Sequence, residues 1–89
     1  MTPDARALLR GFAGEIALLE PFTAIEIDAA LRRFAEQEGR KLGQVAQPLR
    51  AAVTGSSMSP GIDITLAALG RDETLARIGE AIGGEPLDG

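Results

Sequence analysis

Cysteine, histidine, tyrosine and tryptophan are all absent from this 89-residue chain. Without cysteine the chain has no disulfide framework and no thiolate chemistry. Without histidine as well, it cannot by itself build a neutral-pH zinc site or a Ser-His-Asp triad. These absences exclude several of the commonest catalytic and metal-binding classes.

Long hydrophobic runs are missing too. The apolar runs are much shorter than the roughly 20 residues that a helix needs to cross a bilayer, and the first ten residues, MTPDARALLR, lack the hydrophobic segment of a signal peptide. We therefore expect a cytoplasmic soluble domain without a membrane partner. A chain of this length forms one module, and its 45% hydrophobic content is enough for a core.

The charge is negative overall but uneven along the chain. Nine basic and thirteen acidic residues give a net charge of −4, which argues against a general nucleic-acid coat. Between Leu31 and Ala51, however, five cations are opposed by only two acids, so this segment can form a local basic face. Ordinary solvated charges on helix faces explain the same pattern. The cations are Arg32, Arg33, Arg40, Lys41 and Arg50.

Helical patterns run through the whole chain. Apolar residues recur at spacings of three and four in five segments, and none of the segments alternates as a strand does. We predict an all-α fold, a compact bundle of about five short helices over residues 1–84, followed by a polar tail at 85–89. The predicted core residues are Leu9, Phe12, Ala13, Ile16, Leu19, Ile27, Leu31, Phe34, Ala35, Leu42, Val45, Ala46, Leu49, Ala52, Val53, Ile62, Leu66, Leu69, Leu75, Ile78 and Ile82.

The first two helices have recognisable starts. Residues 2–4, TPD, supply a capping hydroxyl, a first-turn proline and an acid near the positive end of the helix dipole. Thr23 and Glu26 match a capping box at the start of the second helix, and Gly39 is suited to end that helix in a left-handed conformation.

The third and fourth helices are less regular. The apolar period predicts that the third helix begins near Leu42. Pro48 should kink this helix, because its ring and missing N–H lie about two turns in, unless the helix proper begins near Gln44 or later. Ser59 and Pro60 are expected to start the fourth helix with a capping hydroxyl and a first-turn proline, and Gly70 is expected to end it.

One corner of the predicted bundle gathers polar groups. Gln47, Arg50 and Thr54 lie three and four residues apart on a face of the third helix that is separate from its apolar stripe. A turn then leads to residues 59–61, SPG, at a helix start whose free N–H groups attract polar acceptors. Such a corner suits unpaired bases. A plain helix-turn-helix in which Arg50 pairs with a neighbouring acid fits the same spacing.

The stretch GQVAQPLRAAVTG, followed by SPGIDITLAALG and RDETLARIGEAI, resembles the C-terminal anticodon-binding domain of bacterial glutamyl-tRNA synthetases. The resemblance covers residues 23–82, whereas residues 2–20 match only as a leucine-rich helix. It implies an all-helical domain that contacts the first and middle anticodon bases of a glutamate-accepting tRNA. The implied partners are this tRNA and the remainder of the synthetase, and we expect a monomer.

The same resemblance assigns site residues one position at a time. Arg50 corresponds to the base-contacting arginine of the family, and the turn and helix start that follow it lie against the anticodon. The expected anticodon-binding residues are Arg50, Thr54, Ser59, Pro60, Gly61 and Ile62. Arg40, Lys41 and Gln47 are the expected contacts with the RNA backbone. The three phenylalanines are committed to the core or to helix starts, so no aromatic platform is expected.

Catalysis is not expected of this chain. The catalytic half of these synthetases needs a His-Ile-Gly-His-type motif and a lysine-rich loop for ATP, whereas this chain has no histidine and a single lysine. ATP and Mg²⁺ therefore belong to a catalytic domain outside this chain, and no cofactor is expected within it. The chain is expected to be a non-catalytic fragment of a glutamate–tRNA ligase, although a free-standing homologue fits equally.

Two other classes fit the composition. Small size, acidity and a serine before a helix, at Ser57 or Ser59, suggest an acyl-carrier-like protein, but the Asp-Ser-Leu context of such carriers is absent. A free-standing helical protein-interaction module is the second. A covalent adduct formed by a phosphopantetheinyl transferase would identify the first class, and a protein partner without RNA binding would identify the second.

Overall fold

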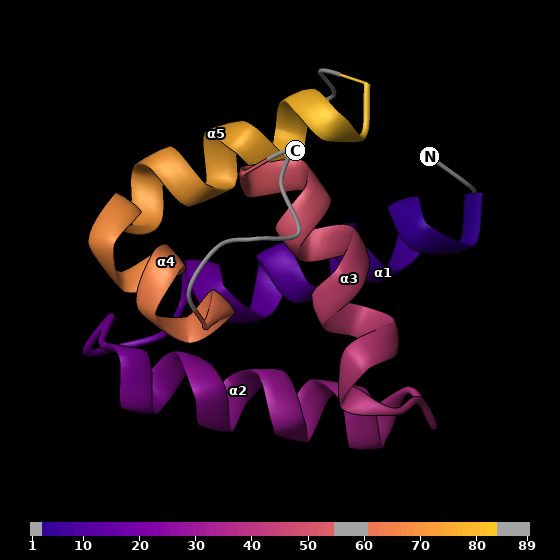
Figure 1. The fold of residues 1–89 in the computed structure, drawn as a ribbon, viewed down its shortest axis with the longest axis horizontal. Helices are drawn as coiled ribbons and strands as arrows, with labels where there is room; N and C mark the ends of the chain where they lie inside the picture. Colours follow the sequence, from indigo (N-terminus) through magenta and orange to yellow (C-terminus); the bar gives the residue numbers. More distant parts are fainter. Residues whose placement is uncertain (1–2, 55–60, 84–89) are drawn as a thin grey trace.

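The structure is a computed structural model that describes residues 3–54 and 61–83. Over these residues the chain forms five α-helices and no strand, which confirms the predicted all-α bundle (Figure 1). Thr2, residues 55–60 and the predicted tail at 85–89 lie outside the described residues. The helices are α1 (Pro3–Ala17), α2 (Ala24–Gln37), α3 (Leu42–Val53), α4 (Ile62–Leu69) and α5 (Arg71–Ala81).

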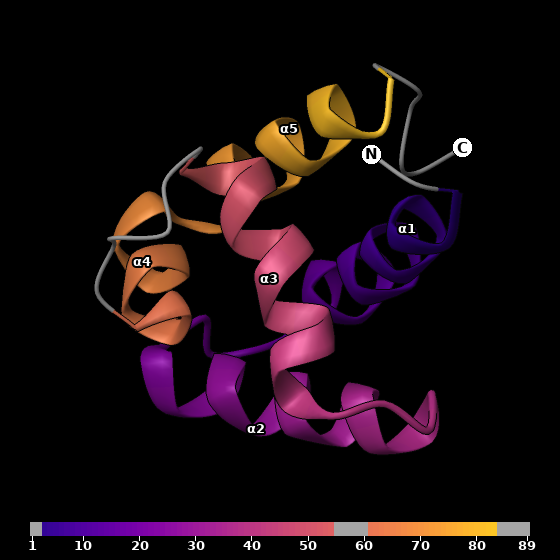
Figure 2. The ribbon, with the colours of Figure 1, turned by 45° about the vertical axis from the view of Figure 1, so that its right-hand side comes forward.

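Helix α3 occupies the middle of the bundle. It packs against each of the other four helices, and Figure 2 shows them arranged around it. Its start lies beside the end of α2, and its last turn lies beside α5 (Figure 1). A side chain on the buried face of α3 is therefore enclosed by neighbours from several directions.

The core follows the apolar stripes predicted from the sequence. Most predicted positions are buried, whereas Leu19, Leu42, Ala46, Ala52, Leu69 and Leu75 are half-buried and pack against the core from its edge. The structure adds Leu8, Ala30 and Thr74, which the prediction did not include. Thr74 of α5 is a fully buried polar residue, so the spacing of apolar residues does not predict its burial.

The start and end of α2 lie where the sequence predicts them, but only the Thr23 half of the predicted capping box is present. Thr23 is the N-cap, and its Oγ1 accepts a hydrogen bond from the Glu26 N–H at 3.3 Å. This bond satisfies one of the free donors of the first turn. Gly39 follows the helix with φ of +66°, a conformation that glycine adopts without a steric penalty.

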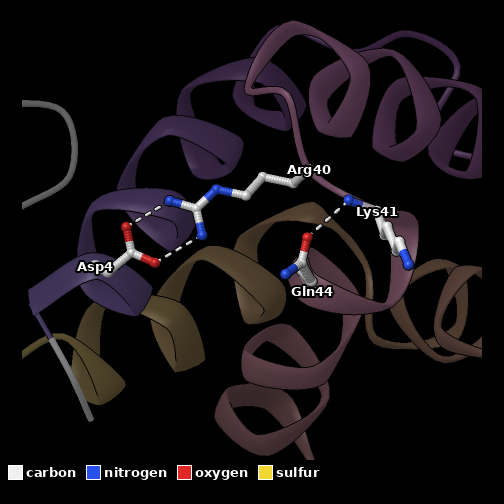
Figure 3. Close-up of polar contacts among 4 residues, drawn as sticks. All are labelled: Asp4, Arg40, Lys41 and Gln44. Carbon is white, nitrogen blue, oxygen red and sulfur yellow. Dashed lines mark hydrogen bonds and ion pairs between the residues drawn. The ribbon is translucent and has the colours of Figure 1, made fainter.

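Helix α3 begins at Leu42, as the apolar period predicts, and continues through Pro48, so the alternative start near Gln44 or later is excluded. The Gln44 side chain helps to start the helix, because Oε1 accepts the Lys41 N–H at 2.9 Å (Figure 3). The proline removes the hydrogen bond to the Gln44 carbonyl. Gln44 is exposed, so water can bond to that carbonyl.

The predicted start of α4 at Pro60 is wrong. The helix begins at Ile62, with Gly61 as its N-cap at φ −48° and ψ 140°. A Cβ at position 61 would lie 2.7 Å from Asp63 Oδ1, so any other residue there would require the Asp63 side chain to move. Asp63 places its negative charge in the first turn, where it interacts favourably with the helix dipole.

Candidate nucleic-acid interface

Arg50 lies in the last turn of α3, next to the fully buried Leu49. Its side chain is half-buried, and its Nε atom is buried without a hydrogen-bond partner in the part of the chain that the structure describes. The ion pairs found among residues 3–54 and 61–83 do not include Arg50. The alternative in which Arg50 pairs with a neighbouring acid therefore finds no support in the described part of the chain. A buried donor without a partner is costly, and an acceptor that reached it would remove that cost.

Thr54 closes the helix that carries Arg50. Its N–H donates to the Arg50 carbonyl at 2.9 Å, and its hydroxyl donates to the same oxygen at 2.8 Å. Both bonds hold the chain in a helical turn as far as residue 54. The role of Thr54 as an anticodon contact stays a prediction.

Gly61 and Ile62 lie at the start of α4, which packs against α3. The Ile62 side chain is only 6% exposed and belongs to the core, so this residue can offer a ligand little beyond its backbone. Gly61 is exposed. Because Asp63 carries a negative charge beside it, the helix start is better suited to the donor groups of a base than to a phosphate. Ser59 and Pro60 lie outside the described residues.

Two of the three expected backbone contacts, Arg40 and Lys41, lie at the other end of α3. Lys41 precedes its first residue and Thr54 follows its last, so the twelve-residue helix separates them by about 18 Å. Gln47 is exposed between the two ends. The structure therefore divides the predicted set into a group at the C-terminal end of α3 and a group at its N-terminal end.

Arg40 is engaged in an ion pair within the protein. Its Nη1 and Nη2 donate to Asp4 Oδ2 and Oδ1 at 2.7 and 2.5 Å, so the pair is bidentate and joins α1 to the segment before α3 (Figure 3). These hydrogen bonds, and secondarily the charge of the guanidinium, hold the pKa of Asp4 below its ordinary value, while partial loss of hydration acts in the opposite direction. A phosphate at Arg40 would have to compete with Asp4.

We expect Asp4→Asn to lower the melting temperature near neutral pH by about 5 °C or less, since exposed ion pairs contribute little. Asp4 has a lower pKa in the folded chain than in the unfolded chain. The pair therefore stabilises the fold above the ordinary aspartate value of about 3.9, and this contribution is lost as the pH falls through the lower folded value. Circular dichroism melts at pH 7 and at about pH 2.5 should show a difference that shrinks in acid.

The matched control is Glu36→Gln, which removes an exposed acid from α2. It should change the melting temperature less than Asp4→Asn at pH 7. A difference between Asp4→Asn and the unmodified chain that persisted undiminished in acid would show that the ion pair is not its source.

Two arginines of α5 bind backbone oxygens of other elements. Arg71 donates from Nη2 to the Leu19 carbonyl, and its Cζ lies 5.5 Å from the ring centroid of Phe22. Arg77 donates from Nη1 to the Val53 carbonyl at 2.7 Å. Arg77 is not among the site residues predicted from the sequence. Its spacing from Glu73 indicates an ion pair within α5, but no sequence pattern indicates the bond to α3.

The aromatic residues lie where the sequence placed them. Phe12 and Phe34 are buried with ring centroids 5.7 Å apart, and Phe22 is half-buried beneath Arg71. None of the three is an exposed stacking platform. In the described residues, no cluster of three or more acidic side chains could hold a metal ion, and no helix is long and apolar enough to cross a membrane.

The chain is similar to proteins of one family over nearly its whole length. A family model described as "Anticodon binding domain" matches residues 1–82, including the first helix that the sequence resemblance had left as a generic match. Glutamate–tRNA ligase 1 of Gluconacetobacter diazotrophicus is 68% identical over 79 residues, which are 89% of this chain and 17% of that protein. Glutamate–tRNA ligase 1 of Gluconobacter oxydans is 61% identical over 75 residues, or 84% of this chain and 16% of that protein.

A solved structure has the same fold. The crystal structure of a glutamate tRNA ligase from Elizabethkingia meningosepticum in complex with its amino acid superimposes with a TM-score of 0.87 at 30% identity. The match covers 91% of this chain and 16% of that one. The chain thus spans about one sixth of the length of the ligases that it matches.

Proposed function

The chain belongs to the anticodon binding domain family, and from this membership we propose that it reads the first and middle anticodon bases of a glutamate-accepting tRNA. The observation that carries the proposal is the position of the Arg50 guanidinium and its lack of an ion pair among the described residues. This guanidinium stands at the C-terminal end of α3 with a buried Nε donor that has no partner among residues 3–54 and 61–83. The family match leaves no support for the acyl-carrier or free-standing interaction classes.

The chemistry of the site suits bases better than phosphates. An arginine fork offers paired donors to the acceptor-rich edge of an unstacked base. The net charge of −4 and the carboxylate of Asp63 both disfavour broad attraction to the RNA backbone. The proposed contacts remain Arg50, Thr54, Ser59, Pro60, Gly61 and Ile62, with Lys41, Gln47 and the Asp4-bound Arg40 as proposed backbone contacts.

In this proposal the domain works in the cytoplasm as one monomeric part of a glutamate–tRNA ligase. The remainder of that enzyme would be its covalent partner and would hold the ATP, the Mg²⁺ and the amino acid. The role of the chain is then selection, since contacts with the anticodon would raise the affinity of the ligase for its own tRNA over others.

An NMR titration of the labelled chain with an anticodon stem-loop tests this proposal. We expect the largest shifts at Arg50 and over residues 54–62, and we expect them to shrink when the first or middle anticodon base is changed. Binding should be weak, with a Kd of roughly 10⁻⁴ to 10⁻⁶ M that rises with salt, because an acidic fragment makes few phosphate contacts.

Two outcomes would contradict the proposal. Shifts centred on Arg32, Arg33 and Arg71 that are the same for every anticodon would reduce the domain to a non-specific phosphate contact. Tight binding that did not change between low and high salt would also oppose this account. A stem-loop of the same length with a scrambled loop sequence controls for binding to the stem.

A further inference from the structure

Arg77 connects α5 to the last turn of α3. Its Nη1 donates to the carbonyl of Val53, the last residue of α3, at 2.7 Å. We propose that Arg77 is a positioning residue for the anticodon site, because it holds the turn from which Arg50 and Thr54 extend. The inference rests on the proposed function and adds to it a residue that need not touch the RNA.

The bond satisfies a group that the helix cannot satisfy by itself. The last four carbonyls of a helix have no donor one turn further along, and the Val53 carbonyl is one of them. A cation at this end also interacts favourably with the negative pole of the helix dipole. Arg77 supplies both the donor and the charge from a neighbouring helix.

A second contact fixes the direction of the Arg77 side chain. Its Nε donates to Glu73 Oε2 at 2.8 Å, one turn earlier on α5. The guanidinium therefore donates from Nε to its own helix and from Nη1 to α3. A lysine has no planar fork, so it can keep the charge and one bond but cannot reproduce this bridge.

The last turn of α3, which Arg77 binds, carries Arg50 and leads to Thr54, the two residues that are proposed to contact the anticodon. The Arg50 carbonyl accepts two hydrogen bonds from Thr54, and Arg77 holds the carbonyl of Val53 between these two residues. Helix ends fray readily, and a frayed last turn would let the Arg50 side chain point in many directions. With the hydrogen bond from Arg77 to Val53 in place, the Arg50 side chain loses less conformational freedom when a base binds.

The test compares the unmodified chain with Arg77→Ala and Arg77→Lys. Arg77→Ala should weaken binding of the cognate stem-loop about 5- to 10-fold and leave binding of a loop with a changed middle base nearly unaltered, so that discrimination falls. Arg77→Lys should recover part of both losses. In the free protein, the Val53 carbonyl and Thr54 amide shifts should move in Arg77→Ala, while circular dichroism shows a folded chain.

Arg32 offers a matched control. It forms the same type of pair with Asp28, four residues earlier on α2, at 2.9 Å. Arg32→Ala removes an equal charge and an equivalent ion pair but no bond to α3, so affinity should change by less than about 2-fold, and discrimination should stay the same.

Three results would overturn the inference. Arg77→Ala could bind both loops as the unmodified chain does. It could lose the same factor on both loops while the slope of log affinity against log salt falls by about 1, which would make Arg77 a direct phosphate contact. If the unmodified chain itself failed to distinguish the loops, the proposed function would fail, and this inference with it.

Discussion

Replacing Leu49 by alanine is expected to lower the free energy of unfolding by about 2–5 kcal/mol, the usual cost of a leucine-sized cavity. Leu49 is 0% exposed and lies on the central helix, which packs against the other four. Because rigid helices surround it on several sides, the space left by the side chain should not collapse. The loss is large against a total stability of roughly 4–13 kcal/mol for a chain of this size.

Urea denaturation followed by circular dichroism measures this change. The matched control is the next residue along the chain, since Arg50→Ala should cost little. Arg50 is half-buried, and its Nε atom has no hydrogen-bond partner among the described residues that the substitution would remove. If Arg50→Ala proved more damaging than Leu49→Ala, Arg50 would be a structural residue, and its assignment to the binding face would be wrong.

Arg50→Ala is expected to weaken binding of the cognate anticodon stem-loop about 10- to 100-fold. The loss corresponds to about 1.5–3 kcal/mol, the contribution of one hydrogen bond to a charged group. Arg50→Lys should restore much of the affinity but not the preference for the cognate anticodon, because an ammonium keeps the charge and loses the planar fork. Fluorescence anisotropy with labelled stem-loops of both sequences measures the two effects.

Arg33→Ala removes the same charge from an exposed position on α2 and controls for the general electrostatic effect. It should lower affinity slightly and equally for all loops. Equal losses from Arg33→Ala and Arg50→Ala, or a preference for the cognate loop that survives in Arg50→Lys, would show that the guanidinium does not read a base.

The amino-acid pattern alone predicted the five helices and most of the core, because apolar spacing of three and four residues depends only on the geometry of one helix. Gly39 and Thr23 were predictable for a related reason, since their effects are confined to a single turn. The candidate role of Arg50 came from its face on the helix and from the motif around it. Only the structure shows that no acid among the described residues pairs with Arg50.

The roles of the other arginines depend on partners that are distant in sequence. Arg40 pairs with Asp4 across 36 positions, Arg71 reaches Leu19 across 52, and Arg77 reaches Val53 across 24. In sequence each of them is a cation on a helix or beside one, and nothing in its neighbours distinguishes a structural arginine from one that is available to RNA. Two of these partners are backbone carbonyls, which every residue carries, so only the packing of α5 against α1 and α3 selects which carbonyl is bound.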